Sequence, residues 1–385
     1  MTRFEFSTAT RIVFGPGTLR EVAPAAREMG KRALLVTGRS QERVVPLLAR
    51  LKEAGIEGFG CVVDDEPTIE LVRRGVEFAR REKCGLVIAF GGGSAIDAGK
   101  AIAALLTNPG EMMDYLEVIG LAKPLTAPSA PFIAVPTTAG TGTEVTRNAV
   151  LASPEHRVKV SMRSPFMLAR LAVIDPELTY GLPPAITART GLDALTQLIE
   201  PFVSARANPL TDGFCLEGIK RVSRSLRRAY HDGKDAEARA DMSLAALLSG
   251  LCLANAGLGV VHGFAGPIGG MFPAPHGAVC AALLPHGMEA NVRALRSRTP
   301  ASDALRRYDE VARVLTARPD AGAEDGVHWV EEICRELEIP PLRTYGITDR
   351  DIPILIDKAS QASSMKANPI ALLPDELHEV LEQSL

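Results

Sequence analysis

The sequence has no long apolar run and no excess of charge of either sign. None of its apolar stretches reaches the ~18 residues that a membrane-spanning helix needs. The formal net charge is only −3, so nothing indicates the basic surface with which proteins bind nucleic acid or anionic membranes. Residues 1–6 alternate polar and apolar side chains as a strand does, and they lack the apolar core of a signal peptide. We therefore expect a globular protein with neither a nucleic-acid nor a membrane partner.

Cysteine is also scarce, and no two cysteines form a C-x-x-C pair. The six cysteines lie mostly in apolar stretches, at positions 61, 84, 215, 252, 280 and 334. Cysteines in such surroundings are typical of reduced thiols in the core of an intracellular protein. The expected compartment is the cytoplasm.

The chain changes character near residue 180. Before that point, short apolar runs alternate with helical segments; strands are predicted at 33–38, 60–63, 86–90, 131–136 and 172–175, and helices at 44–53 and 68–83. Continuous apolar strands separated by helices indicate a mostly parallel sheet with helices on both faces. After residue 184 no strand pattern remains, and helices are predicted at 185–203, 211–230, 236–255 and 308–315. We expect an α/β domain over residues 1–180 and an all-helical domain over residues 181–385.

A glycine-rich loop follows the apolar strand at 86–90. Gly91, Gly92 and Gly93 come directly after it, and Ser94 opens the next predicted helix. Glycines let the backbone turn tightly and approach a ligand, and the start of a helix offers free N–H groups and a positive dipole end to a phosphate. The pattern is neither G-x-G-x-x-G nor a Walker loop. An ordinary turn with Ser94 as helix N-cap is the alternative interpretation.

A second polar loop follows the strand at 131–136. Its hydroxyl groups belong to Thr137, Thr138, Thr141, Thr143 and Thr146. In open parallel sheets, ligands bind beyond the carboxyl ends of the strands. Two polar loops on successive strands therefore favour a nucleotide-sized anion site, in a cleft expected between the two halves of the chain. Either loop alone is also consistent with a surface turn.

The helical half contains a candidate metal site made of Asp193, His262 and His276. The two histidines are fourteen residues apart, which on one unbroken helix would separate them by ~21 Å. Gly269-Gly270 and the Pro-Ala-Pro segment 273–275 interrupt this stretch, so the chain can fold back and bring the imidazoles together. Two imidazoles and one carboxylate suit Fe(II) or Zn(II). Taken singly, each of these residues is more often a solvated aspartate or a core histidine.

Together these motifs resemble the iron-containing (group III) alcohol dehydrogenase family over essentially the whole chain. The matching segments are FGPG at 14–17, GGGSAID at 91–97, PTTAGT at 136–141, GLDALT at 191–196, GLGVVHG at 257–263, PHG at 275–277 and ANP at 367–369. The resemblance implies the architecture shared with dehydroquinate synthase, in which a dinucleotide-binding α/β domain precedes an all-helical domain that holds the metal and the substrate.

The family's usual metal ligands are one aspartate and three histidines. The resemblance implies that Asp193, His262 and His276 are three of these ligands and are the catalytic residues. Gln197 stands where the family has its remaining histidine. A glutamine oxygen can coordinate a metal, but it is neutral and suits Fe(II) or Zn(II) less well than imidazole. Gly266 is a second departure, because many members carry a histidine there, close to the nicotinamide.

For the dinucleotide, the resemblance carries over to the two polar loops and a later lysine. The implied cofactor-binding residues are Gly92, Gly93, Ser94, Asp97, Thr137, Thr138, Thr141, Thr146 and Lys159. Relatives that prefer NAD tend to have an aspartate at the position of Gly38, where it binds the ribose 2′-hydroxyl and repels a 2′-phosphate. Here Gly38, Arg39 and Ser40 remove that acid and supply a guanidinium and a hydroxyl, which bind phosphate well. We predict that NADP(H) is used at least as well as NAD(H).

The resulting hypothesis is a metal-dependent, NAD(P)-linked alcohol dehydrogenase. It would move a hydride between the nicotinamide and an alcohol or aldehyde, with a divalent metal as Lewis acid. A homodimer is expected, paired through a strand at residues 4–11 as in dimers of this family. Three alternatives stay open: a metal-free reductase resembling the maleylacetate reductase branch, an NAD-using lyase similar to dehydroquinate synthase, and a cofactor-binding protein without activity.

Overall fold

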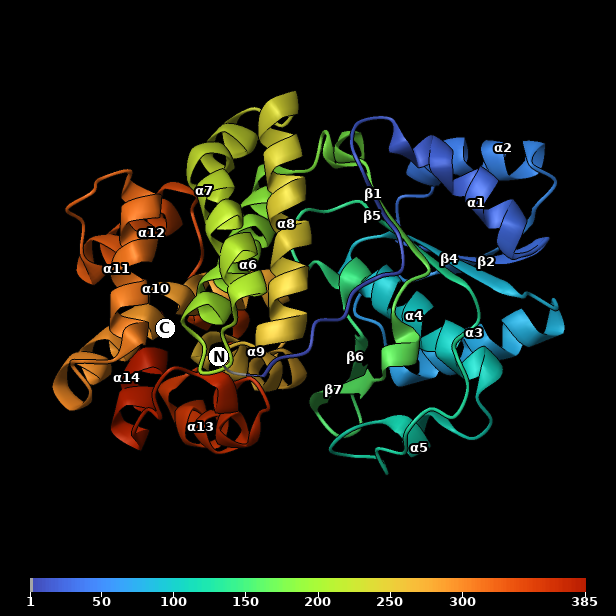
Figure 1. Cartoon of the computed structure of the whole chain (residues 1–385). Coiled ribbons are helices and arrows are strands. Elements are labelled where there is room, and N and C mark those ends of the chain that lie inside the picture. The colour runs from blue at the N-terminus through green and yellow to red at the C-terminus, as the bar shows by residue number, and fades with distance from the viewer. Residues whose placement is uncertain (1–2) are drawn as a thin grey trace. The chain divides into compact units, whose positions relative to one another are not determined.

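The computed structural model describes residues 3–385, which form two compact units (Figure 1). The α/β unit comprises residues 7–138 and 142–180. The helical unit comprises residues 3–6, 139–141 and 181–385. The predicted succession of a parallel α/β fold and an all-helical fold is confirmed.

Six parallel strands form the main sheet of the α/β unit, in the order β1-β8-β5-β4-β2-β3. They are β1 (Ile12–Phe14), β2 (Arg32–Thr37), β3 (Glu57–Val62), β4 (Leu86–Gly91), β5 (Phe132–Pro136) and β8 (Leu171–Ile174). Nearly every residue of the four inner strands is buried, which explains their unbroken apolar sequences. The register pairs Gly91 with Pro136, so β4 and β5 end level with each other.

Helices cover both faces of this sheet (Figure 1). They are α1 (Val22–Met29), α2 (Val45–Glu53), α3 (Ile69–Arg81) and α4 (Gly93–Thr107). α1 and α2 share a core with Leu35, Ile88 and Ile133 on one face. α4 packs on the other face, with α3 beside it. Gly99 permits this close packing, because a Cβ there would lie 2.9 Å from the Cβ of Ala89.

The α/β unit is completed by elements that the sequence patterns did not predict. Besides β1 and α1, they are the short helix α5 (Met112–Tyr115) and an antiparallel hairpin of β6 (Asn148–Ser153) and β7 (Val158–Arg163). Within the described residues of the single chain, the first strand is β1 and residues 3–6 pair with no strand, so the predicted pairing of residues 4–11 with a second copy stays a prediction. The ring of Phe6 lies 6.0 Å from that of Phe214, in the helical unit.

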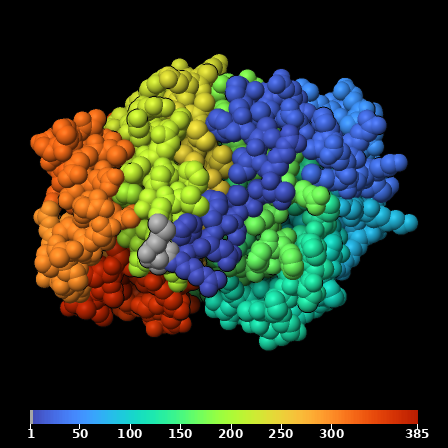
Figure 2. Space-filling view, in the orientation of Figure 1, coloured from blue at the N-terminus to red at the C-terminus, as the bar shows by residue number. Residues whose placement is uncertain are grey.

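Nine α-helices make up the described part of the helical unit. They are α6 (Pro184–Val203), α7 (Pro209–His231), α8 (Ala236–Ala256), α9 (Val260–Met271), α10 (His276–Arg298), α11 (Asp303–Thr316), α12 (Ala323–Glu336), α13 (Ile352–Gln361) and α14 (Pro374–Ser384). α6 packs against α7, α8 and α10, and most of its residues are buried. α11 and α12 are amphipathic and reach the surface, in orange in Figure 2.

Short 3₁₀ helices connect these elements. They are η1 (Thr18–Glu21), η2 (Gln41–Val44), η3 (Thr143–Val145), η4 (Pro165–Met167), η5 (Pro176–Thr179), η6 (Leu342–Tyr345), η7 (Asp349–Asp351) and η8 (Met365–Ala367). Within residues 3–385, no single helix is both long and apolar enough to cross a membrane. Only α8 and α9 taken together pass that test of length and composition, and they are bent by 99°.

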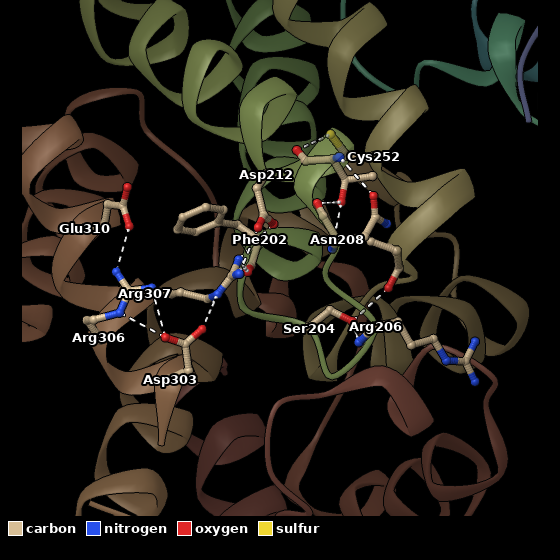
Figure 3. Close-up of polar contacts among 12 residues, drawn as sticks. Phe202, Ser204, Arg206, Asn208, Asp212, Cys252, Asp303, Arg306, Arg307 and Glu310 are labelled. Carbon is tan, nitrogen blue, oxygen red and sulfur yellow. Dashed lines mark hydrogen bonds and ion pairs between the residues drawn. The ribbon is translucent and has the colours of Figure 1, made fainter. Parts of the chain in front are cut away.

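A cluster around Arg307 joins three helices of the helical unit (Figure 3). The guanidinium of Arg307, in α11, makes two 2.8 Å hydrogen bonds to the carboxylate of Asp212, in α7. It also donates to the carbonyl oxygen of Phe202, in α6, and lies over the ring of that residue. Asp303, one turn earlier in α11, accepts a further 2.8 Å bond. One arginine side chain therefore links α6, α7 and α11 through satisfied, charge-assisted hydrogen bonds.

Candidate metal centre

Three helices position the predicted metal ligands. Asp193 lies in the middle of α6, His262 in the first turn of α9, and His276 is the first residue of α10. The break between α9 and α10 falls at residues 272–275, where Pro273 and Pro275 end the helical pattern. The glycine pair 269–270 lies inside the last turn of α9 instead. The fold-back places the two imidazole centroids 5.4 Å apart.

The carboxylate of Asp193 lies between the two imidazoles. Its Oδ1 atom is 3.5 Å from Nε2 of His262 and 3.7 Å from Nε2 of His276. Asp193 is only 1% exposed, and its Oδ1 accepts no well-formed hydrogen bond from any of the described residues. A buried carboxylate oxygen without a hydrogen bond is costly, whereas a cation beside two imidazole nitrogens would satisfy it. The residues therefore fit a divalent metal of the Fe(II) or Zn(II) type.

Close packing of α10 on α6 brings His276 to this position. Gly277 follows His276, and a Cβ at Gly277 would lie 2.6 Å from the carbonyl oxygen of Arg189, in α6. Any larger residue would push the start of α10 away from α6. The Pro-His-Gly segment thus combines the break before α10, a ligand and the glycine that lets the ligand approach.

Cys280 completes a cluster of four possible donors. Its Sγ atom lies 3.7 Å from Nε2 of His262 and 3.7 Å from Nε2 of His276. The ligand atoms of Asp193, His262, His276 and Cys280 all lie within 4.8 Å of one another. Cys280 is a buried free thiol, as the sequence predicted, but its surroundings are imidazoles rather than a purely apolar core. Its position four residues after His276 is the signal in the sequence, because i and i+4 share one helix face.

Gln197 lies one turn after Asp193 and is 2% exposed. Its Oε1 atom accepts a 3.3 Å hydrogen bond from the hydroxyl of Ser249, in α8. Its side chain also hydrogen-bonds to Asp193. Gln197 therefore lies next to the donor cluster, with its polar group already engaged by Asp193 and Ser249.

Glu200 was not singled out from the sequence, although it follows Asp193 by seven residues on the same face of α6. Its Oε2 atom lies 2.7 Å from Nδ1 of His262, and its Oε1 accepts a 2.8 Å bond from the backbone N–H of Val261. A carboxylate can only accept, so Nδ1 of His262 carries the proton. The lone pair of His262 is then on Nε2, directed at Asp193 and Cys280.

Burial and charge act in opposite directions on these groups. Burial alone would raise the pKa of Asp193, but His276 and His262 outweigh it and hold that pKa below its usual value. Burial would lower the pKa of His262, yet Cys280, Asp193 and Glu200 raise it. Burial raises the pKa of the Cys280 thiol to about 12, against the attraction of His262. The cluster thus contains negative and proton-binding groups in water-poor surroundings, which favours a cation.

The predicted dinucleotide loops lie at one edge of the sheet, within the α/β unit. Gly38 follows β2, the glycines follow β4, and Thr137 and Thr138 follow β5. The N–H of Thr137 donates a 2.9 Å hydrogen bond to the carbonyl of Gly91. A Cβ at Gly91 would lie 3.3 Å from the backbone nitrogen of Gly38, and a Cβ at Gly92 would lie 3.5 Å from the hydroxyl of Thr138. The structure therefore brings these three loops together.

The start of α4 differs from the ordinary turn considered for it. Gly92 is the N-cap and Gly93 the first helical residue, so Ser94 does not cap the helix. No side chain accepts a hydrogen bond at this cap. The first N–H groups of α4 are thus available to an anion at the helix start.

The remaining predicted cofactor residues have internal partners. Asp97 accepts hydrogen bonds from the hydroxyl of Thr143 and from the N–H of Val150. The hydroxyl of Thr146 accepts a 2.9 Å bond from the buried ammonium of Lys100. Both interactions hold the second polar loop and β6 against α4. Lys159 forms an ion pair with Glu66 at 2.8 Å, and the exposed Arg39 lies 3.9 Å from Asp65. Ser40 is exposed, and Thr141 belongs to the helical unit.

Comparison with known proteins agrees with this architecture. Residues 9–176 match the model of the iron-containing alcohol dehydrogenase family, and residues 187–385 match that of the C-terminal part of Fe-containing alcohol dehydrogenases. Alcohol dehydrogenase 4 of Schizosaccharomyces pombe is 36% identical, covering 97% of this chain and 87% of the relative. The NAD-dependent methanol dehydrogenase of Bacillus methanolicus is 31% identical, covering 100% of both chains.

A solved structure gives the same result for the fold. The crystal structure of a 1,3-propanediol oxidoreductase superposes with a TM-score of 0.92 at 33% identity, covering 100% of both chains. Two family models together span nearly the whole sequence, and the helical unit contains the aspartate and histidines of a metal site. The chain therefore belongs to the iron-containing alcohol dehydrogenase family.

Proposed function

We propose that this enzyme transfers a hydride between a nicotinamide dinucleotide and an alcohol or aldehyde, with a divalent metal held by Asp193, His262 and His276. One observation carries the metal part: the buried Oδ1 of Asp193, without a well-formed hydrogen bond, faces two imidazole Nε2 atoms at 3.5 and 3.7 Å. Gln197 is either a further ligand or a hydrogen-bonding neighbour of Asp193.

The chain's own residues prepare this site for a polar reaction. When bound, the metal would act as Lewis acid toward the substrate oxygen, and the dinucleotide would supply or accept the hydride. Asp193 contributes negative charge in a buried position, where its attraction for a cation is little screened. Glu200 fixes His262 in the tautomer that leaves Nε2 free to bind. Asp193, Glu200 and Cys280 beside His262 are buried and shield that imidazole from bulk water, whereas His276 keeps one side of the cluster accessible.

We assign the dinucleotide to the α/β unit and the metal and substrate to the helical unit. The loops after β2, β4 and β5 meet at one edge of the sheet, and the start of α4 offers uncapped N–H groups for a phosphate. Gly92, Gly93, Ser94, Thr137 and Thr138 supply those backbone and hydroxyl groups. Asp97 and Thr146 support the same loops from behind through Thr143 and Lys100. Thr141 and Lys159 remain predicted contacts.

The proposed preference for NADP(H) rests on the residues after β2. A Cβ on Gly38 would meet no atom within 4 Å, so open space lies beside this residue, and it has no acid to repel a 2′-phosphate. Arg39 is exposed and lies 3.9 Å from the exposed carboxylate of Asp65, a weak surface pair, so its guanidinium can turn to a phosphate. NADP(H) is therefore used at least as well as NAD(H).

The direct test is oxidation of NADPH and NADH by the purified enzyme with a simple aldehyde, before and after treatment with a chelator. The proposal predicts turnover that the chelator abolishes and a divalent metal restores. His262→Ala should behave like the chelated enzyme, whereas His378→Ala, on the exposed side of α14, should not. Turnover that is unchanged by metal removal would instead support a metal-free reductase. Dinucleotide binding without net consumption of NAD(P)H would support a lyase.

A homodimer in the cytoplasm completes the proposal. All six cysteines are free, in keeping with a reducing compartment. Light scattering at micromolar concentration tests the oligomeric state, and a monomer mass would overturn that part alone.

A further inference from the structure

We propose that the Cys280 thiolate is a fourth metal ligand, in place of the imidazole missing at position 197, and that it makes the site selective for Zn(II) over Fe(II). This inference rests on the proposed metal site and adds a ligand and a metal preference to it. It concerns the same donor cluster on α6, α9 and α10.

The distances match a tetrahedral site that contains one sulfur. With Zn–N near 2.0–2.1 Å and Zn–S near 2.3 Å, neighbouring donor atoms are about 3.3–3.6 Å apart. In the structure, Nε2 of His262 lies 3.5 Å from Oδ1 of Asp193 and 3.7 Å from Sγ of Cys280. Nε2 of His276 lies 3.7 Å from each of the same two atoms. The two remaining pairs of ligand atoms lie within 4.8 Å of each other, so a bound metal would draw these donors closer together.

Two other free thiols, the buried Cys252 and the half-buried Cys334, show what a cysteine without a metal role looks like in this protein. Cys252 has its sulfur 3.5 Å from the carbonyl oxygen of Thr211 (Figure 3), and Cys334 has its sulfur 3.5 Å from that of Ala281. Each is a weak donor to one backbone acceptor. Cys280 instead faces two imidazole nitrogens and the side chain of a buried aspartate.

Gln197 cannot take the same place while its present contacts persist. Its oxygen accepts from Ser249, and its side chain hydrogen-bonds to Asp193. It thus orients the aspartate ligand from behind. Gln197 on α6 replaces the imidazole that would have been the fourth donor. Cys280 supplies a donor from α10 instead, on the same helix face as His276.

Charge and softness then favour zinc. Metal binding would release the proton of the Cys280 thiol to solvent, and the thiolate and the Asp193 carboxylate would then together neutralise a divalent cation. Thiolate is a soft ligand that binds Zn(II) well, whereas a set of one carboxylate and three imidazoles also suits Fe(II). Held by Asp193, His262, His276 and Cys280, zinc would act as Lewis acid toward the substrate oxygen.

The experiment uses the metal-stripped full-length enzyme loaded with Co(II), Zn(II) or Fe(II) under anaerobic conditions. Wild type, Cys280→Ala, Cys252→Ala and the double variant Gln197→His/Cys280→Ala are compared by absorption spectroscopy and by metal affinity. Cys252→Ala is the control for the loss of a buried thiol elsewhere in the same unit. Circular dichroism and thermal unfolding establish that each variant is folded.

Wild type and Cys252→Ala with Co(II) should show thiolate-to-cobalt charge transfer in the near ultraviolet, and Cys280→Ala should lack it. Zinc affinity of Cys280→Ala should fall by more than about 100-fold, beyond the roughly 10–100-fold expected when only an outer partner is lost. The double variant should regain affinity without charge transfer and should discriminate less against Fe(II).

Cobalt that binds to wild type with no charge-transfer band, or with a band that survives in Cys280→Ala, would overturn this inference and leave the proposed function intact. If wild type bound none of the three metals, the metal part of the proposed function would fail as well. The two failures are therefore distinguishable.

Discussion

Nδ1 of His262 donates a 2.7 Å hydrogen bond to Oε2 of Glu200, and both side chains are more than nine-tenths buried. Because the other oxygen of Glu200 accepts from the N–H of Val261, this carboxylate both caps the start of α9 and sets the tautomer of the histidine. An outer residue on α6 thus determines which nitrogen of His262 is available to a metal.

Glu200→Gln should therefore weaken metal binding without removing a ligand. A glutamine that still accepts from Val261 would present its NH₂ group to Nδ1, which then has to accept, and the proton would move to Nε2. We expect metal affinity to fall by roughly 10–100-fold. The matched control is Glu336→Gln, which alters a surface glutamate 3.5 Å from Nε2 of His231. Equal affinity in Glu200→Gln and wild type, measured by competition with a chromophoric chelator, would contradict the assigned tautomer.

Cofactor preference should respond to an acid at position 38. Gly38→Asp has room, because a Cβ there meets no atom within 4 Å, and its carboxylate would repel a 2′-phosphate. We expect kcat/KM for NADPH to fall about tenfold or more, which corresponds to about 1.4 kcal/mol, while that for NADH is kept or rises. Gly85→Asp, in a similarly open place before β4, should leave the ratio unchanged. A parallel loss with both cofactors would argue against a role for the β2 loop.

The buried Glu144 should make stability depend on pH. Burial raises its pKa from 4.5 to about 7, against the attraction of Lys100. Between these values the folded chain keeps a proton that the unfolded chain has lost, so stability falls as the pH rises through this window. Burial lowers the pKa of Lys100 to about 8, so the titration of this lysine changes the stability only above the pH range in which Glu144 acts.

Glu144→Gln removes this titration. The decrease in stability of the α/β unit between about pH 5 and pH 7 should shrink by about 2 kcal/mol relative to wild type. Thermal unfolding across this range provides the measurement. Glu155→Gln, at an exposed turn of the same unit, should retain the wild-type slope. An unchanged slope in Glu144→Gln would show that the glutamate is ionised throughout.

The arginine cluster in Figure 3 offers a test of the fold. Arg307→Ala leaves Asp212, whose side chain is only 23% exposed, without its bidentate partner and should destabilise the helical unit by about 2–4 kcal/mol. The neighbouring Arg306 is 61% exposed and pairs only with Asp303 and Glu310, so Arg306→Ala should cost at most about 1 kcal/mol. Urea unfolding followed by circular dichroism compares the two. Similar losses for both variants would contradict the account of Arg307 as the link between helices.

The strands that the sequence predicted most completely are the inner ones, which are almost fully buried. β2, β4, β5 and β8 are inner strands, so both of their faces require apolar residues and the runs stand out. The hairpin of β6 and β7 alternates buried and half-buried residues and includes Lys159 and Arg163, so its pattern is weaker. The strand expected at the N-terminus was to pair with a second copy of the chain, so it stays a prediction; within the single chain, Phe6 packs on Phe214.

In the metal site, features that depend on neighbouring residues in the sequence could be predicted, and contacts between distant residues could not. The two prolines predicted the break that brings His262 and His276 together. Cys280 was interpreted as a core thiol, because its spacing from His276 has meaning only once α10 is known to begin at that histidine. The bond between Glu200 and His262 joins residues 62 positions apart, and only the packing of α9 on α6 reveals it.

The central claim is that catalysis depends on a metal held by Asp193, His262 and His276. The most direct measurement is turnover of NAD(P)H with an aldehyde as a function of bound metal, starting from chelator-stripped enzyme and adding Zn(II) or Fe(II) stepwise. We predict that turnover rises in proportion to the bound metal and levels off at one metal ion per chain, because residues 3–385 contain one such donor cluster. Full turnover by the stripped enzyme, unchanged by added metal, would contradict the account.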